Sequence, residues 1–68
     1  MGIYYQIVPI GDGLSYVGLD NDGNHIFLDK NISCDKGLLF KEKEEAITYI
    51  DNNLDKDKYK VERILLSV

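Results

Sequence analysis

The chain contains one cysteine, Cys34, and one histidine, His25, among its 68 residues. A disulfide needs two cysteines and a structural zinc site needs several Cys or His ligands, so neither a disulfide nor a zinc ion can stabilise the fold of this chain. Domains of this length bury small hydrophobic cores. Without a disulfide or a metal ion, the stability of such a domain often depends on contact with a partner chain. We therefore expect a single domain over residues 1–68 that self-associates or binds another protein, and we predict no metal and no cofactor.

Net charge and the absence of export patterns restrict the partners and the location. Twelve acidic residues against eight basic residues give a net charge of −4. A protein that neutralises phosphates needs a basic stripe, and none is visible, so we expect no direct nucleic-acid binding. The first residues lack a signal-peptide pattern, no apolar run has the length of a membrane span, and a lone cysteine suits a reducing compartment. These features predict a cytoplasmic protein that does not contact membranes.

The first half of the chain predicts three strands separated by glycine-containing turns. Residues 3–10 are rich in Tyr, Ile and Val and end at the turn 11–13, residues 14–20 form the second strand, and residues 25–30 form the third. Between the last two lies Asp22-Gly23, which is typical of a two-residue type I′ turn. The pattern therefore indicates a meander of three antiparallel strands.

The turns set the predicted register of these strands. A turn centred on Asp22-Gly23 places Leu19 opposite Ile26 and Asp20 opposite His25, as a polar cross-strand pair. A three-residue loop at 11–13 would then place Ile7 opposite Val17 and gather the apolar side chains on one face. A two-residue loop at the same place would turn the first strand over, and the sequence leaves this alternative open.

The second half of the chain predicts one helix and one final strand. Residues 42–54 form the helix, whose apolar arc comprises Ala46, Ile47, Ile50 and Leu54. Residues 58–67 form the strand, which is apolar on both faces near its end and should be covered on both sides. We predict an α+β fold of order βββαβ in two layers, with one helix on one face of a mainly antiparallel four-stranded sheet. The last strand is expected beside the first and parallel to it.

Several residue clusters suggest chemistry that the sequence does not support. Asp20, Asp22 and Asp29 match positions of a calcium loop, but no helix flanks them and a hairpin turn explains them. Cys34 and His25 lack the orienting third group and the oxyanion donors that a nucleophilic site requires. We therefore predict no enzyme, no catalytic residue and no metal site.

The sheet face away from the helix is the predicted interaction surface. In the preferred register it carries Tyr4, Gln6, Val8, Tyr16 and Phe27. Aromatic side chains are enriched at recognition surfaces, so this face is expected to bind a second copy or a target protein. The alternative is that these side chains only stabilise the sheet through cross-strand pairs.

One segment resembles known proteins. Phe40, the run 43–47 (Lys-Glu-Glu-Ala-Ile) and the following strand with Tyr59 and Val61 resemble short accessory proteins of phages and prophages of low-GC Gram-positive bacteria. The resemblance implies a non-enzymatic module that binds and modulates or inhibits a host protein. The alternative function is an acidic inhibitor that mimics nucleic acid, whose carboxylates would come mainly from turn residues: Asp12, Asp20, Asp22 and Asp29.

Overall fold

The computed structural model describes residues 2–32 and 37–66 and has the predicted order of elements. It contains β1 (Gly2–Pro9), β2 (Ser15–Leu19), β3 (His25–Asp29), α1 (Lys43–Asn53) and β4 (Tyr59–Leu66). The α+β class is confirmed, with one helix and four strands, and element boundaries agree to within one residue wherever they fall in the described ranges. Cys34 and Ser67, the expected end of the last strand, lie outside the described residues.

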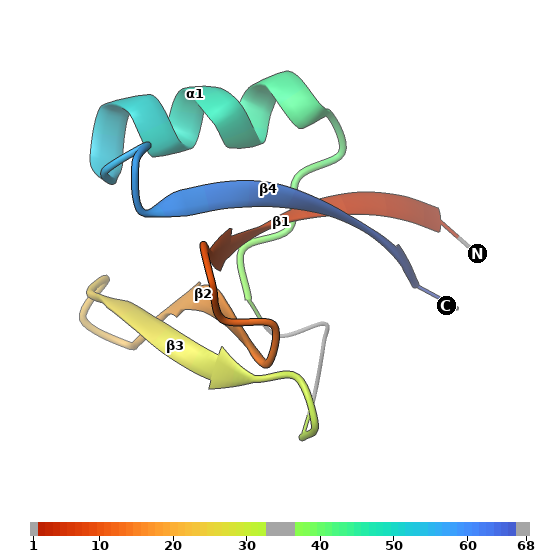
Figure 1. Cartoon of the computed structure of the whole chain (residues 1–68), viewed down its shortest axis with the longest axis horizontal. Helices are drawn as coiled ribbons and strands as arrows, with labels where there is room; N and C mark the ends of the chain where they lie inside the picture. Colours follow the sequence, from red (N-terminus) through yellow and green to blue (C-terminus); the bar gives the residue numbers. More distant parts are fainter. Residues whose placement is uncertain (1, 33–36, 67–68) are drawn as a thin grey trace.

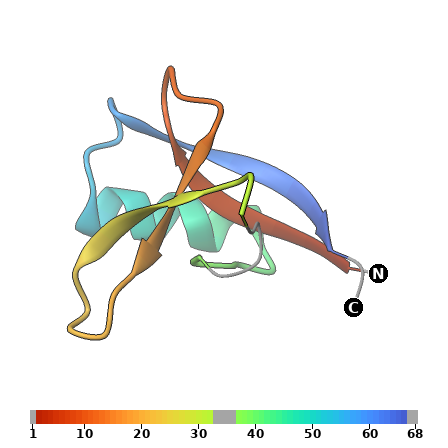
Figure 2. The ribbon, with the colours of Figure 1, turned by 90° about the horizontal axis from the view of Figure 1, so that it is seen from below.

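The prediction of a single four-stranded sheet is wrong, because the strands form two separate antiparallel pairs. β1 pairs with β4 and β2 pairs with β3. β4 is the neighbour of β1 as expected, but it is antiparallel, with Gly2 opposite Leu66 and Pro9 opposite Tyr59. Figure 1 shows the reason: α1 runs along the β1–β4 pair in the direction of β1, so β4 returns in the opposite direction. Figure 2, seen from below, shows the β2–β3 pair crossing the other side of β1 and β4.

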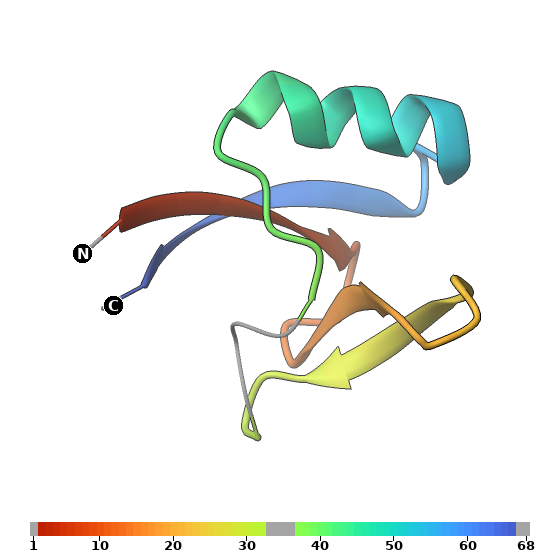
Figure 3. The same cartoon turned by 180° about the vertical axis from the view of Figure 1, so that it is seen from behind.

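A short segment before the helix explains why β1 and β2 do not pair with each other. The backbone of Phe40 exchanges two hydrogen bonds with Tyr5, of 2.8 and 2.9 Å, and Leu38 N–H donates to the Val17 carbonyl at 3.2 Å. Residues 37–40 therefore occupy the edges at which β1 and β2 were expected to meet. Figure 3 shows this segment passing β2 and β1 on its way to α1.

The β2–β3 hairpin is shifted by one residue from the predicted register. Leu19 lies opposite His25 and Val17 opposite Phe27, so the expected Asp20–His25 pair is not formed. The loop has three residues instead of two, because the Asp20 carboxylate accepts the amides of Asp22 and Asn24 at 2.9 and 2.8 Å. Gly23 closes the loop at φ 84°, a conformation that favours glycine. A shift of one residue exchanges which side chains share a face.

The main core lies between α1 and the strands. Its buried members are Ile7, Val17, Ala46 and Ile50. The predicted apolar arc of the helix is correct for Ala46 and Ile50, but Ile47 is 42% exposed. The end of β4 is not covered on both sides as expected, because Leu65 is 62% exposed.

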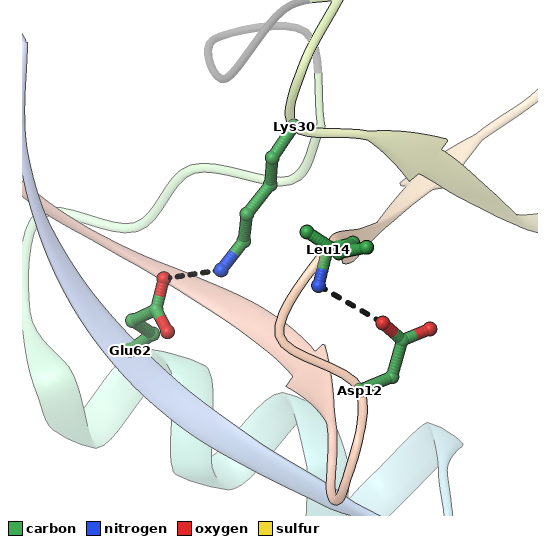
Figure 4. A network of polar contacts seen from close by, with 4 residues as sticks. All are labelled: Asp12, Leu14, Lys30 and Glu62. Carbon is green, nitrogen blue, oxygen red and sulfur yellow. Dashed lines mark hydrogen bonds and ion pairs between the residues drawn. The ribbon is translucent and has the colours of Figure 1, made fainter.

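Side chains also connect the two strand pairs directly. Lys30, directly after β3, donates to the Glu62 carboxylate on β4 at 2.7 Å, as Figure 4 shows. The rings of Phe27 and Tyr59 stack with centroids 6.4 Å apart and planes 14° apart. Among the described residues, no helix has the length and apolar character needed to cross a membrane.

Candidate protein-binding groove

The predicted interaction residues do not form one exposed patch. Gln6, Val8 and Tyr16 are between 0% and 1% exposed, and Tyr4 is half-buried. Phe27 alone is well exposed, at 60%, and one side of its ring rests on Tyr59. The expectation of an open sheet face is therefore wrong for this fold. It fails because the β2–β3 pair crosses this side of β1 and β4 instead of extending their sheet.

A shallow groove runs along one side of α1. It has a volume of about 450 Å³ and is lined by Phe40, Glu44, Glu45, Thr48, Tyr49, Asn52 and Asn53. The helical residues repeat at intervals of four positions, so they form one continuous stripe along the helix. Phe40 is held at the start of this stripe by its backbone bonds to Tyr5. We call this surface the α1 groove.

The aromatic rings of Phe40 and Tyr49 line the groove, and His25 on β3 contacts Tyr49. The rings of Phe40 and Tyr49 lie 5.5 Å apart at an angle of 52°. The Tyr49 hydroxyl is 2.8 Å from His25 Nε2, and the two rings meet edge to face at 5.8 Å. Asn53 Nδ2 donates to the Tyr49 carbonyl at 3.2 Å. Tyr49 is therefore fixed by β3 on one side and by its own helix on the other.

The charged side chains that line the groove have one sign. Glu44 and Glu45 lie in the first turn of α1, where the positive end of the helix dipole favours carboxylates. No lysine or arginine lines the groove among residues 2–32 and 37–66. Thr48, Asn52 and Asn53 add hydroxyl and carboxamide groups that can donate and accept hydrogen bonds. The groove thus combines an apolar floor with an acidic end and a neutral polar end.

The lining of the groove offers an apolar floor and hydrogen-bonding side chains. Its side chains include no cysteine or lysine nucleophile, and the described part of the chain holds no group of three metal-ligating residues. His25 bonds to a tyrosine hydroxyl and not to a carboxylate that would orient it as a base. What the groove can do is bind an apolar side chain and an adjacent cationic group.

The acidic turn residues act mainly within their own turns. Asp12 accepts the amide of Leu14, and Asp29 accepts the amide of Asn31, at 2.9 and 2.8 Å. Hydrogen bonds to its carboxylate lower the pKa of Asp20, and the bond donated by the backbone amide of Asn24 has the largest effect. These bonds explain Asp12, Asp20 and Asp29 as turn formers, which weakens the case for carboxylates placed to imitate a phosphate backbone.

Sequence reasoning missed Tyr49 and His25 as parts of one surface. Tyr49 lies beside the apolar arc of the helix and was not included in it, and His25 was assigned to the wrong cross-strand partner. The signal that was available is the repeat of paired positions 44–45, 48–49 and 52–53, which begins shortly after Phe40. Comparison with protein-family models, curated proteins and solved structures finds no match to this chain.

Proposed function

We propose that this protein is a non-catalytic binding module whose α1 groove takes a basic segment of a partner protein. The observation that carries the proposal is the combination of an aromatic floor, Phe40 and Tyr49, with the carboxylates of Glu44 and Glu45 in one open groove. Such a module would act by covering the partner's basic segment, as expected of a modulator or an inhibitor of a host protein.

The lining residues define the chemistry of the bound segment. A leucine or aromatic side chain would lie on Phe40 and Tyr49, because both rings present apolar surface. A lysine or arginine beside it would face Glu44 and Glu45, where opposite charges attract across solvent. The carboxamides of Asn52 and Asn53 would bind the peptide backbone of the segment. A volume of about 450 Å³ is within the size of sites that hold a few side chains.

Overall charge supports the same partner chemistry. The chain has a net charge of −4, so it attracts basic segments and repels acidic ones at long range. The attraction is screened by salt, since the groove is open to solvent. Binding should therefore weaken as ionic strength rises, and the association rate should fall most.

The test uses two fluorescein-labelled peptides that differ only in charge. One alternates leucine with lysine, the other alternates leucine with glutamate, and both are titrated with the protein while fluorescence polarisation is measured. The lysine peptide should bind and the glutamate peptide should not. Equal binding of both peptides, or of neither, would refute the proposal.

A matched pair of variants locates the binding site. Glu45→Lys reverses a charge that lines the groove, and Glu42→Lys makes the same change at the helix N-cap, outside the lining. We expect Glu45→Lys to weaken binding of the lysine peptide about tenfold and Glu42→Lys to weaken it far less, since attraction falls with distance in salt. Equal losses in both variants would show that net charge alone, and not the groove, binds the peptide.

A further inference from the structure

β4 presents a strand edge whose backbone groups have no partner within the described part of the chain. Among residues 2–32 and 37–66, β4 is hydrogen-bonded only to β1, in a two-stranded sheet. Ile10 N–H donates to the Lys58 carbonyl, while Tyr5 bonds to Phe40 on the opposite edge of β1. Because bonding alternates along an antiparallel pair, even-numbered residues of β4 bond to β1 and odd-numbered residues point their amides and carbonyls outward. The outward groups belong to Tyr59, Val61, Arg63 and Leu65.

An edge of this kind is a template for pairing with another strand. Natural edges are protected by proline, by bulges, by very short length or by charged side chains, and β4 carries the last of these in Lys60, Glu62 and Arg63. β4 has eight residues, contains no proline, and pairs with β1 without a bulge along its whole length. In Figure 1 it lies in front of β1, with its outer edge turned away from the rest of the molecule. The apolar residue Leu65, 62% exposed, lies near one end of this edge.

The charges on β4 are complementary to a second copy of the same strand. We infer that two chains associate through β4, antiparallel and related by a twofold axis at Val61. This register places Lys60 opposite the partner's Glu62, and it does so twice because of the symmetry. On the other face Tyr59 lies opposite the partner's Arg63, which permits a cation–π contact. The result is a continuous four-stranded sheet of order β1-β4-β4-β1.

Neighbouring twofold registers are less favourable. An axis at Lys60, Glu62 or Arg63 places that charged residue opposite its own copy, and like charges directly opposite are destabilising. An axis at Ile64 places Glu62 opposite the partner's Leu66, with no cation to face the carboxylate. Val61 is therefore the centre that pairs opposite charges without also placing like charges opposite each other. Lys60 is exposed, and the Glu62 side chain is 38% exposed. One Glu62 carboxylate oxygen already accepts from Lys30, so the second oxygen is the one that would face the partner's Lys60.

Charge reversal with rescue by mixing tests both the surface and the register. Sedimentation equilibrium of the wild-type chain should give twice the 7.8 kDa of one copy. Lys60→Glu and Glu62→Lys should each raise the dimer dissociation constant about tenfold, because two symmetry-related pairs become repulsive at once. An equimolar mixture of the two variants should form heterodimers as tight as the wild-type dimer, because every pair is again opposite in sign.

Two further variants separate association from folding. Arg63→Pro removes an outward amide that β1 does not use and should abolish the dimer. Lys56→Glu makes the same charge change as Lys60→Glu outside the strand and should leave the dimer intact. Circular dichroism checks that each variant is folded, which matters most for Glu62→Lys because it loses the ion pair with Lys30. A wild-type chain that stays monomeric, a dimer that resists Lys60→Glu and Arg63→Pro, or folded variants that fail to associate when mixed would each overturn the inference.

Discussion

His25 Nε2 and the Tyr49 hydroxyl lie 2.8 Å apart, and this hydrogen bond joins β3 to α1 across 24 residues of sequence. Tyr49→Phe removes the hydroxyl and keeps the ring that packs on Phe40. Because the bond is exposed to solvent, we expect the free energy of unfolding to fall by only about 0.5–1 kcal/mol. Urea unfolding of the wild type, Tyr49→Phe, His25→Ala and the double variant measures the loss as a double-mutant cycle. Strictly additive losses in the cycle would show that the two side chains do not interact in solution.

The Asp20 loop predicts a defined dependence of stability on pH. Backbone hydrogen bonds lower the pKa of Asp20 in the folded chain, and the bond from Asn24 has the largest effect. The folded pKa lies below the unfolded pKa, so the stabilising contribution of this carboxylate is present above about pH 4 and is lost as pH falls through the folded pKa. Asp20→Asn lacks this contribution, so its unfolding free energy should change less than that of the wild type between neutral pH and pH 3. Urea unfolding of both proteins over this pH range measures the difference. An equal pH dependence of the unfolding free energy in both proteins would show that Asp20 does not make this contribution.

Gly37 should tolerate no side chain. A Cβ at this position would lie 2.5 Å from the Tyr16 ring and 2.6 Å from the Val17 carbonyl oxygen, and the carbonyl cannot move without shifting β2. We expect Gly37→Ala to lower the unfolding free energy by about 2 kcal/mol or more, within the range for overpacked sites. Gly13→Ala is the matched control, because nothing lies within 4 Å of its added Cβ. Thermal unfolding of both variants provides the comparison, and similar melting temperatures would show that Gly37 has more room than the structure gives it.

The elements could be predicted from sequence because local signals determine them. The Tyr- and Ile-rich strand, the glycine turns and the helical spacing of Ala46 and Ile50 are readable within short windows. The strand pairing was not predictable in the same way, because residues 37–40 bond to both Tyr5 and Val17, which are distant in sequence. The predicted register of the β2–β3 hairpin was wrong for a local reason. Asp20 was expected to face His25, but its carboxylate instead accepts two loop amides and adds one residue to the turn.

The prediction of the interaction surface was wrong because it depended on the single four-stranded sheet, which does not form. Gln6, Val8 and Tyr16 lie on an open face only if four strands lie side by side, and two separate pairs that cross bury them instead. The groove that the structure contains depends on where Phe40 lies, and its backbone bonds to Tyr5 determine this position. Spacing along the helix could identify the stripe that lines the groove. Only the tertiary structure could bring His25 to Tyr49.

The ion pair between Lys30 and Glu62 should contribute little to stability, although its atoms are 2.7 Å apart. The two side chains are 22% and 38% exposed, so water screens their attraction and holding both chains still costs entropy. We expect Glu62→Gln to lower the unfolding free energy by less than about 1 kcal/mol, with a smaller loss at high salt. Urea unfolding in low and high salt is measured in an Arg63→Pro background, so that self-association through β4 does not contribute.

Lys30→Met in the same background should give a similar loss of unfolding free energy, and the double variant should lose no more than either single variant. A loss of several kcal/mol in Glu62→Gln would instead show that this pair, and not the Phe27–Tyr59 stack, is the main link between the two strand pairs.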